Sequence, residues 1–298
     1  MQDVGPSRIE IAYERLGDPE GPPVLLVMGA GAQLIHWPDG LCADLVARGL
    51  QVVRFDNRDT GLSTHITDGP TPDLAAALAG DVSSASYSLS DMAADTIGLL
   101  DALELESAHV VGASLGGMIA QTMAIEHPRR VRSLTSIMST TGDLPVGRPD
   151  FQVLAGLGLQ PAGRQEFLDW AVRASRAIGS PGFPFDEEAV RERSGRAWDR
   201  DHDPLTFARQ ALAAMASGDR TARLRSLAVP ALVIHGADDR MCDLSGGQAT
   251  ADAIPGAEIV VIKGMGHDLP RALWPELAAR IAALVERAER AEASPEGG

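Results

Sequence analysis

The stretch over residues 109–117 constrains the fold of this chain more than any other. It reads HVVGASLGG, so an apolar strand pattern ends in G-x-S-x-G and a helical pattern over 115–126 begins at once. In so sharp a reversal, side chains two residues either side of Ser114 would collide with backbone, so Gly112 and Gly116 are expected there. The pattern predicts a nucleophile elbow, with Ser114 in a strained conformation and its hydroxyl exposed at the end of a sheet.

The segments around this motif strengthen the prediction of a nucleophile elbow. G-x-S-x-G alone is weak evidence, because it arises readily by chance in a chain with 31 glycines. Here a strand pattern precedes it, a helical pattern follows it, and an acid and a histidine stand suitably downstream. The helix over 115–126 would aim the free N–H groups of its first turn at the point where an oxyanion forms.

Composition limits the class of protein. A chain of 298 residues with 45% hydrophobic content can form one large α/β domain with an insertion, or two ordinary domains. The net charge of −15 is spread along the chain, which argues against nucleic acid or an anionic membrane as a partner. No apolar run approaches the roughly 18 residues of a membrane span, and the first residues lack a signal-peptide pattern. We expect a cytoplasmic protein with a small-molecule partner; composition does not predict its oligomeric state.

The two cysteines carry no motif. Cys42 and Cys242 lie far apart, with no C-x-x-C spacing and no histidine-rich companion, so reduced structural thiols are favoured over a disulfide. No metal site is predicted.

Apolar runs and helical patterns alternate through most of the chain. This rhythm predicts an α/β fold with a mostly parallel central sheet flanked by helices. An edge strand or hairpin over 8–16 precedes it, and a disordered tail is expected over 291–298. The predicted strands are 24–28, 51–55, 109–113, 131–138, 228–234 and 258–262, and the predicted helices are 89–103, 115–126, 246–253 and 270–290, with Ser88 or Ser90 as cap of the first.

The alternation stops over 142–227, where helical patterns are broken at Pro149, Pro161, Pro181, Pro184 and Pro204. We expect a helical cap over 142–227, inserted into a core formed by 1–141 and 228–290. Of the six Phe, four Trp and two Tyr in the chain, seven lie in this insertion. They are the insertion's own core in one interpretation; in the other, some of them, with Trp170 and Trp198 as candidates, line a substrate pocket.

A glycine-rich turn, Gly29-Ala30-Gly31, follows the strand over 24–28. It has a competing interpretation as a dinucleotide-binding loop, helped by Asp56 at the end of the next strand. The third glycine of that fingerprint falls on Leu34, so the signature fails and no cofactor is expected. The favoured interpretation is that the backbone N–H groups of Ala30 and Leu115 form an oxyanion hole.

The polar loop over 56–63 reads DNRDTGLS. We expect a structural role for it, with Arg58 and Asp59 in local pairing that fixes the backbone.

A base and an acid follow the serine in chain order. His267 comes after the last predicted strand on a turn at Gly266, and either Asp238 or Asp239 ends the strand before it. A serine hydroxyl needs a neutral imidazole to take its proton, and a carboxylate to hold that imidazole in the right tautomer. The other histidines do not fit this role: His109, His127 and His235 are expected to be structural, and His36, His65 and His202 carry no pattern.

These motifs together resemble the α/β-hydrolase fold serine esterases over about residues 7–290. Within that fold the chain is similar to the aclacinomycin methylesterases of anthracycline tailoring. The resemblance implies hydrolysis of a carboxylic ester, and counting from Gly236 it places Asp239 at the acid position. The carrying segments are VMG at 27–29, DNRDTGLS at 56–63, the elbow, and GMGH at 264–267.

Two departures from the family pattern stand out. Met28 replaces a histidine before the oxyanion turn, which costs hydrogen bonding around the turn but leaves the backbone donors intact. Arg240 replaces the proline that commonly follows the acid.

The sequence thus predicts a serine hydrolase, with the methyl ester of an aromatic polyketide among its candidate substrates. A serine at the elbow argues against haloalkane dehalogenase and epoxide hydrolase chemistry, which use an aspartate there. The alternatives are a cofactor-free haloperoxidase (perhydrolase) with the same triad and an inactive hydrolase fold that binds a ligand.

Overall fold

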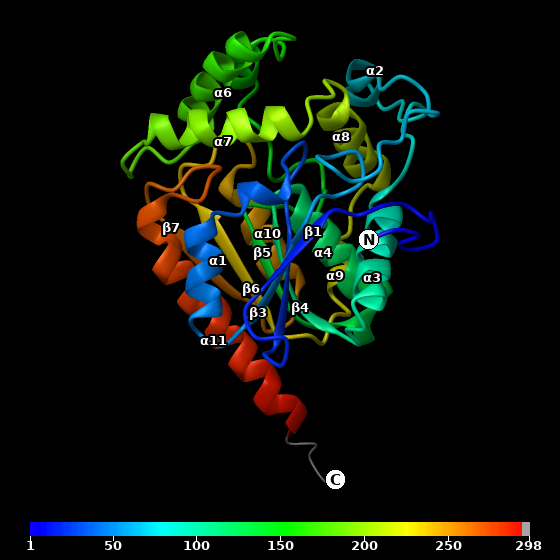
Figure 1. The fold of residues 1–298 in the computed structure, drawn as a ribbon, viewed down its shortest axis with the longest axis vertical. Coiled ribbons are helices and arrows are strands. Elements are labelled where there is room, and N and C mark those ends of the chain that lie inside the picture. Colours follow the sequence, from blue (N-terminus) through cyan, green and yellow to red (C-terminus); the bar gives the residue numbers. More distant parts are fainter. Residues whose placement is uncertain (294–298) are drawn as a thin grey trace.

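A seven-stranded sheet forms the centre of the protein, and its strands lie in the order β1-β3-β2-β4-β5-β6-β7 (Figure 1). The structure, a computed structural model, describes residues 1–293. β1 is antiparallel to β3 and all other neighbouring pairs are parallel, so the predicted α/β fold is confirmed. The strands are β1 (Tyr13–Leu16), β2 (Pro23–Val27), β3 (Gln51–Phe55), β4 (Ala108–Ala113), β5 (Val131–Ile137), β6 (Ala231–Gly236) and β7 (Glu258–Ile262).

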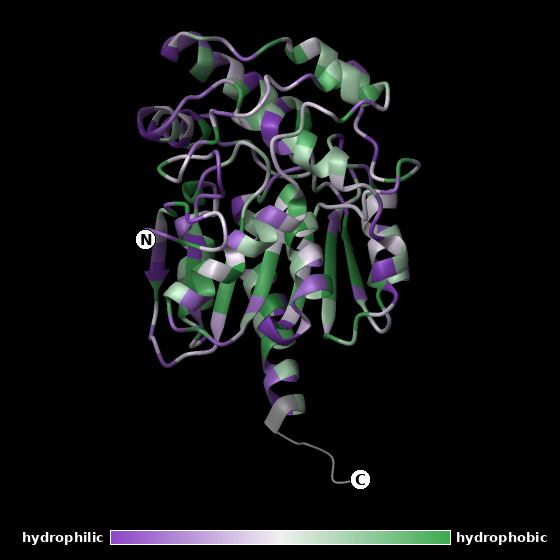
Figure 2. Cartoon of the chain, turned by 90° about the vertical axis from the view of Figure 1, so that its right-hand side faces the viewer, coloured by the Kyte–Doolittle hydropathy of each residue, from purple (hydrophilic) through white to green (hydrophobic). Residues whose placement is uncertain are grey.

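Helices cover both faces of the sheet. On one face α1 (Asp39–Val46) and α11 (Trp274–Ala293) share a hydrophobic core with the strands. On the other face α3 (Leu89–Ala102), α4 (Leu115–Glu126) and α10 (Leu244–Ala253) do the same. β3 and β4 are buried along their whole length and are mostly apolar, with Gln51, Arg54 and His109 as the polar exceptions. Figure 2 shows the hydrophobic strands at the centre of the molecule.

The segment between β5 and β6 is helical, as expected. Both views place α6 and α7 above the carboxyl ends of the strands (Figures 1 and 2). The later helices of the segment behave differently, since Ala213, Leu224 and Leu227 pack into the core on the α3 and α4 side of the sheet. A separate cap over 142–227 therefore stays a prediction. The helices are α5 (Phe151–Leu157), α6 (Arg164–Ile178), α7 (Glu187–Arg200), α8 (Thr206–Ser217) and α9 (Thr221–Leu224).

Several predicted boundaries need correction. β6 begins at Ala231, not at residue 228, and Pro230 immediately before it has no N–H to offer a ladder. The edge strand is confined to Tyr13–Leu16. The long amphipathic helix α11 continues through Ala293, so residues 291–293, predicted to belong to a disordered tail, are helical. The rest of that predicted tail, residues 294–298, lies outside the described residues. A short helix, α2 (Leu74–Leu78), was not predicted.

The elbow between β4 and α4 has the predicted strain. Ser114 has φ of 54° and ψ of −121°, a region that residues with a side chain rarely occupy. A Cβ added to Gly112 would lie 2.1 Å from the Gly116 carbonyl oxygen, and one added to Gly116 would lie 2.0 Å from that of Val27. The two glycines let β4, α4 and the end of β2 approach one another, which sets the position of Ser114.

We predict that Gly116→Ala destabilises the protein by about 3 kcal/mol or more, because its methyl group meets rigid backbone. Gly156→Ala is the matched control, since a Cβ there has nothing within 4 Å. That change should be neutral or stabilising by up to about 1 kcal/mol. Urea unfolding followed by circular dichroism measures both variants, and equal midpoints would contradict the role assigned to Gly116.

Candidate active site

Three side chains from separate loops meet at the carboxyl end of the sheet. Ser114 Oγ lies 3.0 Å from His267 Nε2, and His267 Nδ1 lies 2.7 Å from Asp239 Oδ2. Asp239 follows β6 and His267 follows β7, so the parallel strands deliver both to the edge where the elbow lies. The structure thus joins the three residues that the sequence singled out.

The two neighbouring aspartates have different partners. The side chain of Asp239 is fully buried, and its second oxygen accepts hydrogen bonds from the N–H groups of Met241 (2.8 Å) and Cys242 (2.9 Å). Asp238 instead accepts a hydrogen bond from the Gly264 N–H, at 2.8 Å. Of these two aspartates, Asp239 is the one whose hydrogen bond to His267 the structure shows, and its assignment as the acid stays a prediction.

The loop that carries His267 is also held from outside the sheet. The His267 N–H donates to the carbonyl of Ile178, the last residue of α6, at 2.8 Å. The Gly266 N–H donates to Ser180 Oγ at 2.9 Å, and the Gly182 N–H donates to the Gly264 carbonyl at 2.9 Å. The segment between β5 and β6 thus positions the imidazole.

The turn after β2 lies directly against the serine. A Cβ on Gly29 would lie 3.0 Å from Ser114 Cβ, so the turn and the elbow touch. Ala30 follows Gly29 in this turn, and Leu115 follows Ser114 as the first residue of α4. Asn57 Nδ2 donates to the Met28 carbonyl at 3.0 Å and anchors the start of the turn. The two N–H groups predicted to form an oxyanion hole, those of Ala30 and Leu115, therefore belong to the two segments that touch at Ser114.

The predicted local pairing of Arg58 with Asp59 is wrong. Arg58 forms a buried ion pair with Asp95 of α3, with Nη2 and Oδ1 2.8 Å apart. Asp59 pairs with Arg209 of α8, with Oδ2 and Nε 3.0 Å apart. Because both side chains are buried, each needs a partner of opposite charge, and the fold supplies one from a distant helix.

Asp56, in the same loop, also reaches the insertion. It accepts hydrogen bonds from the N–H groups of Leu34 (2.6 Å) and Leu62 (3.0 Å), and it pairs with Arg200 at the end of α7. Burial raises the pKa of Asp56, although these hydrogen bonds and Arg200 act in the opposite direction. Asp56 pairs with Arg200 of α7 and Asp59 pairs with Arg209 of α8, so the loop over 56–63 connects two helices of the insertion to the core.

The two candidate tryptophans pack within the insertion. Trp198 lies 4.9 Å from Phe167 and 4.4 Å from His202 between ring centroids, and Trp170 Nε1 donates to the Leu157 carbonyl at 3.0 Å. Phe207 of α8, which the sequence did not single out, lies against the oxyanion turn: a Cβ on Gly31 would be 3.3 Å from Phe207 Cβ. Phe207 is 41% exposed, so this aromatic surface beside the turn is accessible.

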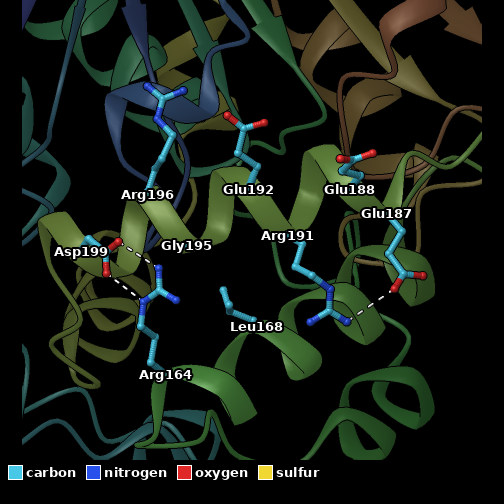
Figure 3. A pocket seen from close by; sticks show the side chains of 9 residues that line it. All are labelled: Arg164, Leu168, Glu187, Glu188, Arg191, Glu192, Gly195, Arg196 and Asp199. Carbon is cyan, nitrogen blue, oxygen red and sulfur yellow. Dashed lines mark hydrogen bonds and ion pairs between the residues drawn. The ribbon is translucent and has the colours of Figure 1, made fainter.

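A separate hollow of about 700 Å³ lies between α6 and α7 (Figure 3). Charged side chains dominate its lining, and ion pairs such as Arg164 with Asp199 cross it. Neither Ser114 nor His267 lines this hollow, so it is not the place where the three side chains meet.

Three further positions support the site without a sequence signal. Ser139 Oγ donates to the Ser114 carbonyl at 2.7 Å, Asn57 anchors Met28, and Gln210 contacts Gly31. Each is a common polar residue in a loop or amphipathic helix, where spacing does not reveal a distant partner.

Both cysteines and His235 have structural surroundings. Cys42 and Cys242 are buried free thiols, and burial raises the pKa of Cys42 to about 11. His235 Nε2 lies 2.8 Å from the Cys242 carbonyl, and burial lowers the pKa of this ring. In residues 1–293 no three His, Cys, Asp or Glu side chains are grouped to hold a metal ion. Over the same residues, no helix combines the length and apolarity needed to cross a membrane.

The fold and this site define a class of protein. Residues 22–270 match the model of the alpha/beta hydrolase fold family, so the chain belongs to that family. The resemblance found in the sequence is thereby confirmed.

Comparisons with individual proteins agree. The chain is 32% identical to the rhodomycin D methylesterase DauP of Streptomyces sp. (strain C5), over 91% of this chain and 93% of the relative. It is 27% identical to a putative non-heme bromoperoxidase, BpoC, of Mycobacterium tuberculosis, over 87% of this chain and 91% of the relative. A crystal structure of a hydrolase from Pseudomonas aeruginosa PA01 superposes with a TM-score of 0.68 at 25% identity, covering 96% of both chains.

Proposed function

We propose that the protein is a cofactor-free serine hydrolase that cleaves a carboxylic ester. Ser114 is the nucleophile, His267 the general base and then acid, and Asp239 the residue that orients the imidazole. The observation that carries the proposal is the line of hydrogen bonds from Ser114 Oγ through His267 to Asp239, at 3.0 and 2.7 Å. Methylesterase relatives support the same activity.

The geometry supports a two-step reaction. Ser114 Oγ attacks the ester carbonyl while His267 takes its proton, and the alkoxide of the tetrahedral intermediate accepts hydrogen bonds from the Ala30 and Leu115 N–H groups. His267 then protonates the departing alcohol, which leaves an acyl group on Ser114. Water, activated by the same imidazole, releases the acid.

The similarity to BpoC favours one second candidate, a perhydrolase that intercepts the acyl group with hydrogen peroxide instead of water. Both activities need the same three residues, so they differ only in the second nucleophile. The inactive ligand binder stays the alternative from another class.

For the substrate, we propose the methyl ester of an aromatic polyketide. The name of the relative DauP, a rhodomycin D methylesterase, supports this class. The accessible ring of Phe207 beside the oxyanion turn supplies an aromatic surface, and Trp170 and Trp198 are proposed to contribute apolar contacts from the insertion. Burying about 200 Å² more apolar surface than a small ester gives several kcal/mol at most, at roughly 25 cal/mol per Å², before ordering costs.

The first prediction tests the nucleophile. A fluorophosphonate probe should label the wild type stoichiometrically at Ser114, because only an activated hydroxyl attacks it. Ser114→Ala should fold normally, stay unlabelled, and lose on the order of 10⁶ in kcat. Mass spectrometry of the labelled peptide identifies the site. Labelling elsewhere would exclude Ser114, and an unlabelled folded wild type would favour the ligand binder.

The second prediction tests the acid. Asp239→Asn should lower kcat by on the order of 10⁴, because His267 is left in the wrong tautomer. Asp238→Asn is the control, since this neighbour contacts the Gly264 N–H and not the imidazole. Steady-state kinetics on a p-nitrophenyl ester measures both variants. A greater loss in Asp238→Asn would show that the assignment of the acid is wrong.

The third prediction tests the substrate class. A methyl ester of an aromatic polyketide should show a higher kcat/KM than p-nitrophenyl acetate once the better leaving group of the latter is taken into account. Phe207→Ala, Trp170→Ala and Trp198→Ala should erode this preference while sparing the small ester. An outright preference for small acyl esters, or equal losses on all substrates, would contradict it. Product analysis with added hydrogen peroxide separates hydrolysis from perhydrolysis in the same assay.

A further inference from the structure

One fully buried amide connects the insertion to the turn beside Ser114. Gln210 of α8 accepts a hydrogen bond from the Gly31 N–H through Oε1, at 2.8 Å. Its Nε2 donates to the Arg58 carbonyl and to Thr60 Oγ1, both at 2.7 Å. Both amide N–H groups and the carbonyl oxygen are thus engaged, so the orientation of this side chain is fixed from three directions.

The Gly31 N–H belongs to the peptide unit that begins at the Ala30 carbonyl. Holding that N–H fixes the plane of the peptide directly after Ala30. The Ala32 N–H closes the turn from its other end by donating to the Gly29 carbonyl at 3.2 Å. Gly31 has φ of +68°, a region that favours glycine, and because a glycine populates positive and negative φ about equally, the free turn could adopt other shapes. A partner that anchors the turn is therefore needed.

We propose that Gln210 is a positioning residue for ester hydrolysis: from α8 it fixes the turn over 29–31 so that the Ala30 N–H points at the developing oxyanion. This inference rests on the proposed function. It gives the segment between β5 and β6 a role in the chemical step as well as in substrate binding, because displacement of α8 would release the oxyanion donor.

Hydrogen-bond donors accelerate acyl transfer when they already point at the position where the negative charge develops. Loosening the turn should therefore weaken binding of the transition state more than binding of the substrate. A purely structural amide would behave differently, since its loss would lower the free energy of unfolding and leave kcat unchanged.

The test compares three variants. Gln210→Leu removes all three hydrogen bonds, and Gln210→Glu keeps an acceptor for the Gly31 N–H. Thr60→Val is the matched control, because it removes one bond of the same amide and leaves the bond to Gly31 intact. For each, kcat and KM on p-nitrophenyl acetate, the Ki of a trifluoromethyl ketone and the melting temperature are measured. The ketone forms a tetrahedral adduct on the serine and so reports on the oxyanion donors.

Gln210→Leu should lose on the order of tenfold in kcat with KM nearly unchanged, and should bind the ketone more weakly by a similar factor. Gln210→Glu should recover part of both losses, and Thr60→Val should match the wild type in kcat even if it melts lower. If Gln210→Leu does not fold, the comparison of Gln210→Glu with Thr60→Val still tests the proposal. Gln210→Glu should then have a lower kcat and weaker binding of the ketone than Thr60→Val. Equal kcat and equal Ki in these two variants would overturn the proposal.

Wild-type kcat and Ki in a folded Gln210→Leu variant would also overturn the proposal, as would equal losses in Thr60→Val. Fluorophosphonate labelling of the wild type separates the two levels of inference. An unlabelled Ser114 rejects the proposed function itself, whereas a labelled Ser114 with unaffected Gln210→Leu kinetics rejects only the positioning role.

Discussion

The close approach of three backbone segments around Ser114 is the constraint on which the rest of the site depends. The end of β2, the elbow and the first turn of α4 are so near one another that Gly112 and Gly116 have no room for a Cβ. This contact places the turn after β2, which carries Ala30, against the serine, which Leu115 follows directly. The strain at Ser114 is maintained because β4 is paired with β2 and β5 along its length.

The elements encoded by local patterns were predictable from the sequence. The elbow helix has the predicted bounds, Leu115–Glu126, and Ser88 caps α3 with Asp91 in a capping box. Ser114 and His267 follow from the chain order of strands, because parallel strands carry their carboxyl ends to one edge. Asp239 needed one more piece of information, the register of its loop, which the resemblance to a family supplied and the contact with His267 now supports.

Partners that come from distant segments were not predictable. Arg58 and Asp59 are adjacent and of opposite charge, so local pairing was a reasonable expectation. Both are buried, however, and the fold supplies Asp95 of α3 to one and Arg209 of α8 to the other. Nothing in a single sequence connects residue 59 to residue 209, or Gln210 to Gly31. Such pairs depend on how the insertion packs on the core, which hydrophobic periodicity does not determine.

The departure at Met28 shows how the site is organised without the common histidine. The Met28 carbonyl accepts a hydrogen bond from Asn57, and three residues further on the Gly31 N–H donates one to Gln210. Both anchors act on backbone groups, so neither involves the side chain of Met28, which packs in the core shared with α1 and α11. One anchor comes from the loop after β3 and the other from the insertion, which also holds His267 through the Ile178 carbonyl. The proposed base and the proposed oxyanion donor are therefore positioned by the same inserted segment, and a change in that segment that alters substrate binding also acts on the geometry of the reaction.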